Sequence, residues 1–329
     1  MIVPISHPDK LLFPDDGITK GELAEYYETI APVMLPHIIG RPVTMERFHR
    51  GINAPGFFQK DVKKGFPSWL ERVEVPKQGG TVHHPIVTDT RSLVWLANQN
   101  SITPHVWTRR LSDLQHPDIC VFDLDPPDGG APQVLRAAVL ALRDLLAELG
   151  LASWVKTTGS KGYHVAVSLD GSVDLPTAAH FADAVGTLLA RRDPKHLTQE
   201  FHKVDRDGRI LVDTGRNNYS ATFAAAYAVR ARPGAPISAP CTWEEIERGV
   251  VGPRTFTLRT MHERVSSAGD PWADMLKRKQ PLDKAIEHLR DLQERLASHP
   301  PQEARSDAAA TLPPKSKPRG GRSGRAREM

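Results

Sequence analysis

Apolar positions recur with the spacing of an α-helix in several stretches of the chain. The clearest stretch is 132–149, where valine, leucine and alanine side chains form one broad face that ends at Gly150. The same spacing predicts four further helices, over 20–39, 175–192, 242–248 and 281–298.

Short runs rich in β-branched and aromatic residues alternate with these helices. They predict strands over 81–87, 119–123, 153–157, 164–168, 210–213 and 225–230. Several of these runs lie too close together for a crossover helix, so hairpins and an antiparallel or mixed sheet are expected. The fold class predicted is α/β, of the α+β kind.

Composition excludes several classes of protein. Of the 329 residues 40% are hydrophobic and 25% charged, as in a soluble globular enzyme and unlike a disordered or collagen-like chain. No apolar stretch is long enough to span a membrane, and the first residues lack the order of an export signal, so we expect a cytoplasmic protein. Cys120 and Cys241 are too few for a disulfide framework and are expected to be reduced.

The charge is unevenly distributed. Residues 303–329 carry seven Lys or Arg and three Asp or Glu, which leaves 36 of each sign in residues 1–302. Any basic groove must therefore be local. We expect one domain over 1–300 and a disordered basic tail over 301–329, either solubilising or a nonspecific tether to nucleic acid.

Two acidic residues end the predicted strand at 119–123. Because side chains alternate along a strand, Asp123 and Asp125 are expected on one face, with Leu124 in the core. Two adjacent carboxylates suit Mg²⁺ or Mn²⁺, although solvated acids at a strand end are the other interpretation. Asp213 also ends an apolar run and supplies a third carboxylate if its strand lies beside the first; otherwise it caps a turn.

A glycine-containing turn lies between the acid-bearing strands. Gly159 and Gly162 allow close approach of a ligand, and Ser160 and Lys161 offer groups that bind phosphate. The spacing is not that of a P-loop. A plain turn is the alternative, but neighbouring acids favour a triphosphate site.

Arginines and aromatic residues complete the candidate chemistry. Arg206, Arg216, Arg230 and Arg232 carry guanidinium groups that match phosphate oxygens, and in a strand the last two share a face. Further candidates near the N-terminus are Phe57, Phe58 and Lys60. Adjacent residues of an extended chain face opposite ways, so one ring is expected to pack inward while the other stacks on a base; the alternative is that both rings belong to the core.

Four ordered motifs resemble the polymerase domain of bacterial ligase-D-type end-joining enzymes, a branch of the archaeo-eukaryotic primase superfamily. They occupy 122–126, 158–164, 211–217 and 227–236, and the resemblance covers nearly all of residues 9–296. It implies a primase-polymerase core, in which an RRM-like catalytic sheet joins a second α/β unit. It also implies template-directed nucleotidyl transfer to 3′ ends at DNA double-strand breaks, with a preference for ribonucleotides.

The resemblance also implies roles for individual residues. Two Mn²⁺ or Mg²⁺ ions would be held by Asp123, Asp125 and Asp213. The incoming nucleotide would be bound by His105, Thr158, Ser160, Lys161, His164, Arg206, Asn217, Arg230 and Arg232. DNA would be bound by Lys10 and Lys20 at a 5′-phosphate, and by Phe57, Phe58 and Lys60. Tyr163 stands where the family has a Leu and could narrow the nucleotide pocket.

The Lys-x-Asp-Gly pattern of a ligase nucleophile does not occur in the sequence. We therefore expect a separate DNA ligase and a Ku-type end-binding protein as partners, and association with the nucleoid. Alternative functions are a de novo primase, a metal-dependent glycosyltransferase that uses the Asp-x-Asp pair, and a non-catalytic protein that bridges DNA ends.

Overall fold

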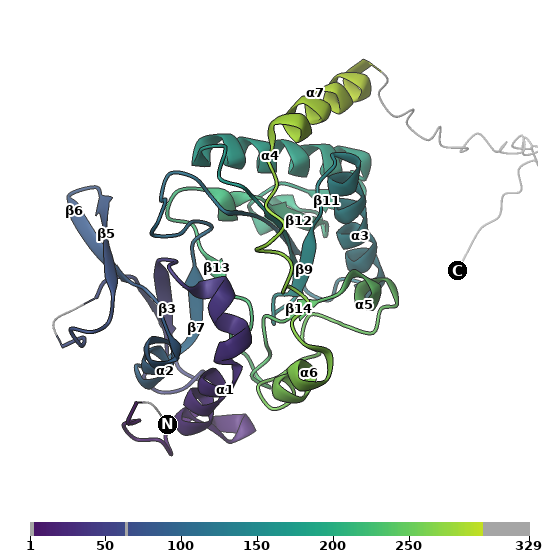
Figure 1. Ribbon diagram of the computed structural model, residues 1–329. Coiled ribbons are helices and arrows are strands. Elements are labelled where there is room, and N and C mark those ends of the chain that lie inside the picture. Colours follow the sequence, from purple (N-terminus) through teal and green to yellow (C-terminus); the bar gives the residue numbers. More distant parts are fainter. Residues whose placement is uncertain (1–2, 63–64, 299–329) are drawn as a thin grey trace, which may run out of the picture.

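The computed structural model describes residues 3–62 and 65–298 (Figure 1). The predicted tail over 301–329 lies outside the described residues. In the described part, the strands form a six-stranded sheet, a four-stranded sheet and two separate hairpins.

The six-stranded sheet has the order β11–β12–β8–β10–β9–β14. Only β11 and β12 pair in parallel; the other neighbours are antiparallel. Its strands are β8 (Ile119–Asp125), β9 (Trp154–Thr157), β10 (Tyr163–Ser168), β11 (Leu197–Thr198), β12 (Ile210–Asp213) and β14 (Pro240–Cys241).

The four-stranded sheet has the order β13–β7–β3–β4. Its strands are β3 (Val43–Arg47), β4 (Phe57–Gln59), β7 (Ser101–Val106) and β13 (Phe223–Ala224). The two hairpins pair β1 (Leu11–Phe13) with β2 (Ile18–Thr19), and β5 (Arg72–Lys77) with β6 (Gly80–Pro85).

Helices pack on both sheets. The helices are α1 (Lys20–Ile38), α2 (Thr90–Asn98), α3 (Pro132–Glu148), α4 (Leu175–Arg192), α5 (Trp243–Glu247), α6 (Met261–Ala268) and α7 (Asp283–Ser298), with 3-10 turns η1 (Pro14–Asp16), η2 (Lys203–Asp205) and η3 (Gly215–Asn217). α1 begins at a capping box, in which Thr19 and Glu22 each accept a hydrogen bond from the other's backbone N–H.

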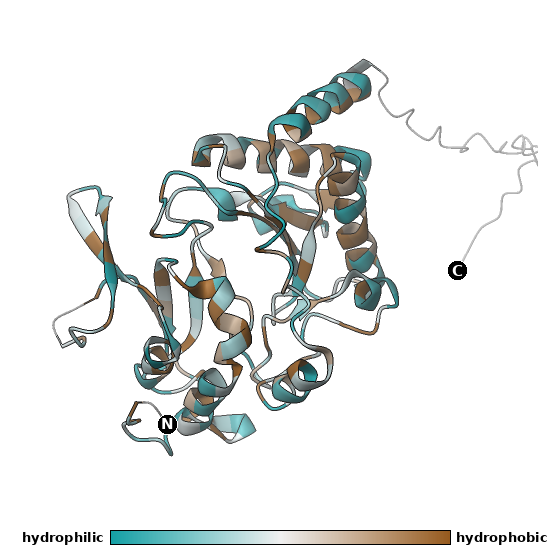
Figure 2. Ribbon diagram, in the orientation of Figure 1, coloured by the Kyte–Doolittle hydropathy of each residue, from teal (hydrophilic) through white to brown (hydrophobic). Residues whose placement is uncertain are grey.

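Two large apolar cores fill the molecule. Helices α3 and α4 bury their apolar faces against the six-stranded sheet, whereas α1 and α2 contribute to the core beside the four-stranded sheet. Figure 2 shows alternating apolar and polar residues along α3 and α4, as expected for helices with one buried face. This arrangement confirms the predicted catalytic sheet joined to a second α/β unit.

One predicted strand is wrong. The segment 225–230 forms only an isolated bridge, between Val229 and Ile237. Tyr227 has a φ of 65°, in the left-handed region that strands exclude. The spacing rules also missed α2 and the strands β3, β4 and β7.

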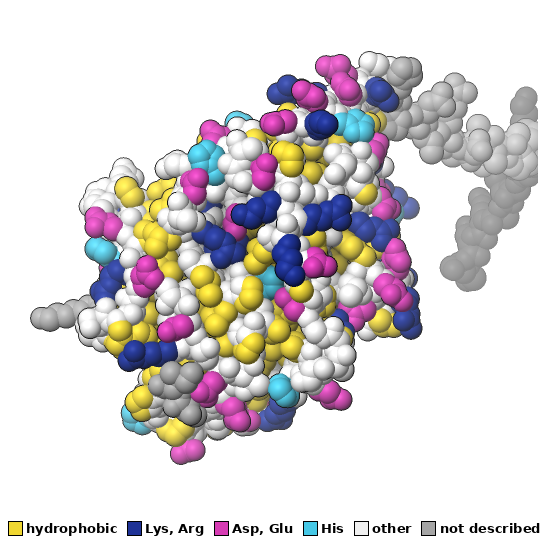
Figure 3. Space-filling view, viewed as in Figure 1, with side chains coloured by type: hydrophobic (Ala, Val, Ile, Leu, Met, Phe, Trp, Pro, Cys, Tyr) yellow, Lys and Arg dark blue, Asp and Glu magenta, His cyan; other side chains and the backbone are white. Residues whose placement is uncertain are grey.

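The surface and the helices agree with two further expectations from the sequence. Figure 3 shows basic and acidic side chains interspersed over one face, in keeping with the balanced charge of residues 1–302. Within residues 3–62 and 65–298, none of the helices has the length and apolar character needed to cross a membrane.

We predict that Gly162→Ala destabilises the fold. A Cβ at this position would lie 1.8 Å from the Leu124 carbonyl oxygen, so β8 and the turn after β9 would have to separate. The free energy of unfolding should fall by about 3 kcal/mol, measured by thermal or urea denaturation. Gly252→Ala is the control, because its Cβ would make ordinary contacts; equal stability of the two variants would contradict the prediction.

Candidate active site

Three carboxylates meet at the centre of the six-stranded sheet. Asp123 and Asp125 are alternate residues of β8, and Leu124 between them is fully buried. β12 runs antiparallel to β8 in a register that pairs Asp213 directly with Asp123. All three acids line one cavity of about 260 Å³. The predicted convergence of the three acids is confirmed.

Two arginines contact the three acids and offset part of their charge. The Nη2 atom of Arg216 lies 3.1 Å from Asp123 Oδ2 and 3.3 Å from Asp213 Oδ2. Arg206 Nη1 lies 3.2 Å from Asp125 Oδ2. One guanidinium therefore bridges two of the acids, and a second contacts the third.

Burial and these contacts shift the pKa values in opposite directions. Burial would raise the pKa of Asp123, but His164 and Arg216 outweigh it and hold the pKa well below its usual range. Burial raises the pKa of Asp213, against the attraction of Arg216 and with the repulsion of Asp123. The two paired acids thus differ in how readily they bind a proton.

A histidine and a lysine lie buried beside Asp123. His164 pairs with Asp123 in the β-ladder, and its Nε2 lies 3.3 Å from Asp123 Oδ2. Burial lowers the pKa of His164 to about 4, so the imidazole is neutral at pH 7. Lys156, opposite His164 on β9, is fully buried; its ammonium contacts the Ser238 hydroxyl, and burial lowers its pKa far below the usual value.

The glycine-containing turn connects β9 to β10 at the edge of the cavity. The Thr158 hydroxyl accepts hydrogen bonds from the backbone N–H groups of Ser160 and Gly162, so it shapes the turn. The Lys161 ammonium contacts Asp128. Arg254, which the sequence reasoning missed, donates from Nε to the Ser160 carbonyl at 2.7 Å.

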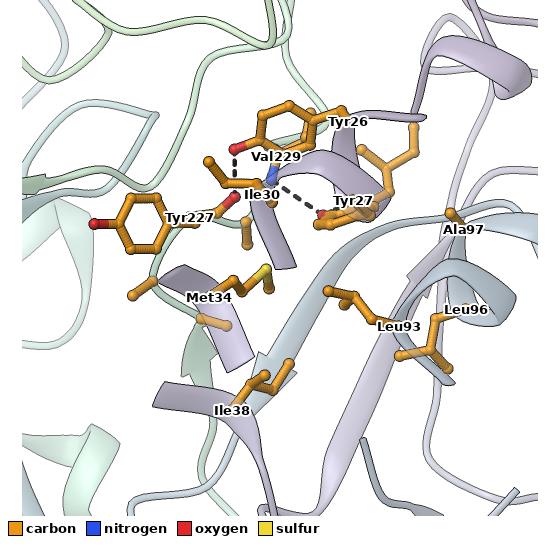
Figure 4. Close-up of a cluster of buried hydrophobic side chains, with 14 of the residues drawn as sticks. Tyr26, Tyr27, Ile30, Met34, Ile38, Leu93, Leu96, Ala97, Tyr227 and Val229 are labelled. Atoms are coloured by element: carbon orange, nitrogen blue, oxygen red, sulfur yellow. Dashed lines mark hydrogen bonds between the residues drawn. The ribbon is translucent and has the colours of Figure 1, made fainter. Parts of the chain in front are cut away.

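Arg230 reaches the same turn from the irregular segment after β13. Its Nη1 donates to the Thr158 carbonyl at 2.8 Å. Figure 4 shows two tyrosines of α1, which form hydrogen bonds to the backbone of this segment. The Tyr26 hydroxyl donates to the Tyr227 carbonyl at 2.8 Å, and the Val229 N–H donates to the Tyr27 hydroxyl at 3.1 Å. These bonds attach the segment to α1.

Aromatic residues of β4 lie beside a second, open cavity. Phe57 and Phe58 are 41% and 61% exposed, so the expectation that one ring packs inward is wrong. Both rings line this cavity together with Lys60. Phe58 also meets His105 edge to face at 5.4 Å, and the His105 Nε2 lies 3.2 Å from Glu46 Oε2. This contact links the two cavities.

Lys20 is buried near the N-terminus, and its ammonium donates to the carbonyl and the hydroxyl of Ser6 at 2.6 and 2.9 Å. Lys10 lies close enough to lower the Lys20 pKa. Neither lysine lines the cavity with the acids.

The structure brings most of the predicted nucleotide-binding residues together and separates two. The cavity with the acids is lined by His105, Thr158, Ser160, Lys161, His164, Arg206 and Arg230. Asn217 does not line it, because its amide bonds to both backbone groups of Val121. Arg232 is exposed and also lies outside, since the segment is not a strand. Tyr163 does not narrow the cavity: its hydroxyl donates to the Val251 carbonyl, in the core.

The sequence of this chain is similar to those of known proteins. A family model described as "LigD, primase-polymerase domain" matches residues 19–272. The chain belongs to this family. The multifunctional non-homologous end joining protein LigD of Mycolicibacterium smegmatis is 37% identical over 283 residues, 85% of this chain and 36% of that protein. The Pseudomonas aeruginosa protein of the same description is 35% identical over 291 residues, which are 86% of this chain and 34% of that protein.

A solved structure of the family is also similar. The polymerase domain of Mycobacterium tuberculosis ligase D, in complex with DNA, has a TM-score of 0.80 and 33% sequence identity, covering 84% of this chain and 99% of that chain. The LigD primase-polymerase family is one of DNA-directed nucleotidyltransferases, which places this chain among enzymes of that class. The chain spans about a third of the length of the curated relatives it matches.

The acid cluster of this LigD-family chain has the ligand chemistry of a divalent-metal site. Carboxylate oxygens are the ligands that Mg²⁺ and Mn²⁺ prefer. In the part of the chain that the structure describes, no group of three or more His, Cys, Asp or Glu side chains is already arranged around one point. Arg216 contacts both Asp123 and Asp213, so a metal held by these two acids would displace its guanidinium.

We predict that Arg216→Gln strengthens Mn²⁺ binding while it lowers stability without metal. The variant loses the cation between Asp123 and Asp213, so Mn²⁺ no longer displaces a guanidinium. A site ten times tighter would stabilise the variant by about 1.4 kcal/mol more than the wild type at saturating Mn²⁺. Thermal denaturation with and without Mn²⁺ measures this. Arg143→Gln is the control, because Arg143 pairs with Glu247 of α5 and does not line the cavity with the acids; equal Mn²⁺ stabilisation of all three proteins would count against a metal site here.

Proposed function

We propose that this chain extends DNA 3′ ends at double-strand breaks during non-homologous end joining, by template-directed transfer of nucleotides. The observation that carries this proposal is the register of β12 against β8, which pairs Asp213 with Asp123 inside a cavity bordered by a phosphate-binding turn. Membership of the LigD primase-polymerase family supports the same reaction.

In this proposal Asp123, Asp125 and Asp213 hold two Mn²⁺ or Mg²⁺ ions. When bound, such ions lower the pKa of an attacking hydroxyl and neutralise charge on a leaving pyrophosphate. The neutral His164 orients Asp123 through its Nε2 contact.

The incoming nucleoside triphosphate is held by the turn after β9 and by the guanidinium of Arg230. Backbone and hydroxyl groups of Thr158 and Ser160 offer hydrogen bonds, and Lys161 adds a positive charge after it leaves Asp128. We infer a preference for ribonucleotides from the family resemblance. Comparing the kcat/KM of extension with rNTP and dNTP tests it.

DNA is bound on two further surfaces. The exposed Phe57 or Phe58 stacks on a template base, with Lys60 beside a backbone phosphate. Lys10 and Lys20 bind the 5′-phosphate of the downstream strand. A Ku-type protein and a DNA ligase complete the joining reaction, so the protein would act at the nucleoid.

The acids provide the main test. The double variant Asp123→Ala, Asp125→Ala should reduce nucleotide addition to a 3′-overhanging duplex in Mn²⁺ by about 10³-fold or more, because the metal ligands are gone. Asp144→Ala, an exposed acid on α3, is the control and should extend DNA normally. Extension by the double variant at the wild-type rate would end the proposal. De novo synthesis without a primer would instead indicate a primase.

The pKa of Lys20 predicts a pH dependence. Burial lowers this pKa to about 8, with Lys10 and Arg47 adding to the shift. The ammonium is charged at pH 7 and loses its proton as the pH rises to 9, so the preference for a 5′-phosphorylated downstream strand should decline over that range. The measurement is the ratio of Kd values for phosphorylated and unphosphorylated DNA.

Lys20→Arg and Lys20→Met are the matched variants for this test. The guanidinium stays charged at both pH values, so Lys20→Arg should keep the preference, whereas Lys20→Met, which retains only Lys10, should show a weaker preference that is the same at both pH values. A wild-type preference that stays constant from pH 7 to 9 would refute the role of Lys20.

A further inference from the structure

An exposed aromatic side chain borders the acid-lined cavity and has no part in the function so far. Phe201 lies in the connection between β11 and β12, and it is 73% exposed although it lines the cavity. Its neighbour His202 lies nearly perpendicular to the ring, with the two ring centroids 5.7 Å apart, so no aromatic side chain of the described residues stacks flat on Phe201. Because the ring is exposed and also lines the cavity, it can contact a ligand that enters there.

The position of Phe201 relative to the acids is fixed by one guanidinium. Arg206 is 9% exposed and contacts Asp125 Oδ2 through Nη1 at 3.2 Å. The same side chain donates from Nη2 to the Phe201 carbonyl at 2.8 Å, and from Nε to the Glu200 carbonyl at 3.1 Å. The backbone that carries the phenyl ring is therefore attached directly to the acid cluster.

The order of strands separates Phe201 from the triphosphate site. The sheet runs β11–β12–β8–β10–β9, with the acids on the middle strands β8 and β12. The turn for the triphosphate joins β9 to β10 on one side of the acids, and the connection that holds Phe201 joins β11 to β12 on the other side. The two binding elements thus flank the acids.

The positions of these two elements fit the geometry of in-line displacement at phosphorus. The attacking oxygen and the leaving group lie on opposite sides of the phosphorus atom. With pyrophosphate on the side of the β9–β10 turn, the attacking 3′-hydroxyl approaches from the side of the β11–β12 connection. The strand end that carries this hydroxyl then lies over Phe201.

We propose that Phe201 stacks on the terminal base of the strand that is extended. The proposal rests on the proposed function, since it assigns the site for the primer end in that reaction. The partner is a nucleic-acid strand because the exposed Lys203 lies in the same connection, two residues after the ring, where its ammonium can meet a backbone phosphate. Stacking accepts any base, as extension of broken ends of varied sequence requires.

The test compares two exposed apolar residues of the same connection. Val204 is 86% exposed but does not line the cavity. Phe201→Ala should raise the KM for a 3′-overhanging duplex about 10-fold and leave the nucleotide Kd unchanged, whereas Val204→Ala should change neither. Because both side chains are exposed, both variants should keep the wild-type Tm. Phe201→Trp should retain the wild-type KM, and Phe201→Leu, which has no flat ring, should resemble Phe201→Ala.

A fluorescent base locates the contact. 2-Aminopurine at the 3′ end of the primer should be quenched on binding to the wild type and to Val204→Ala, and much less on binding to Phe201→Ala. The same base at the templating position should respond equally to all three proteins. Quenching that depends on Phe201 only at the templating position, or a nucleotide Kd raised with an unchanged primer KM, would overturn the proposal.

Failure of this inference can be told apart from failure of the proposed function. If the double variant of Asp123 and Asp125 still extends DNA, both fail. If it does not, and Phe201→Ala extends with the wild-type KM and the wild-type quenching, only the assignment of Phe201 is wrong.

Discussion

Repulsion between three carboxylates in one sheet is the constraint on which the rest of the site depends. The register of β12 against β8 brings Asp213 opposite Asp123, and the alternation of β8 adds Asp125 on the same face. Such a cluster is stable only with positive charge close by. The chain supplies Arg216 and Arg206 for this, at 3.1 to 3.3 Å from the acids. The same need for a cation makes the cluster suited to divalent metals.

The remaining elements take their positions from that sheet. One side of the acids carries the β9–β10 turn, the other side the connection between β11 and β12, and the four-stranded sheet brings His105 to the rim. The segment that carries Arg230 to the turn is bonded to two tyrosines of α1, and its Tyr227 has a left-handed backbone. A helix that lies in the other core thus shapes the nucleotide site.

Local patterns in the sequence correctly predicted features that are set by residues adjacent in the chain. Alternation along a strand placed Asp123 and Asp125 on one face with Leu124 inside, and this is confirmed. The strand assignment of 225–230 failed because Tyr227 has a left-handed backbone, and the segment's partners include Tyr26, 201 positions earlier in the chain. Asn217 was assigned to the nucleotide from its motif, but its amide completes the backbone bonding of Val121, which no local pattern reveals. Contacts between residues far apart in the sequence could not be predicted from the sequence alone.

The two cysteines have a practical consequence for chemical labelling. Cys120 and Cys241 are both buried and unpaired, and burial raises the pKa of each thiol to about 12. Thiolate is the reactive form, so burial and the raised pKa both slow the reaction of these thiols with maleimides and mild oxidants at neutral pH. A single cysteine introduced on the surface therefore becomes the one reactive handle for a dye or a spin label, with no need to remove the native pair.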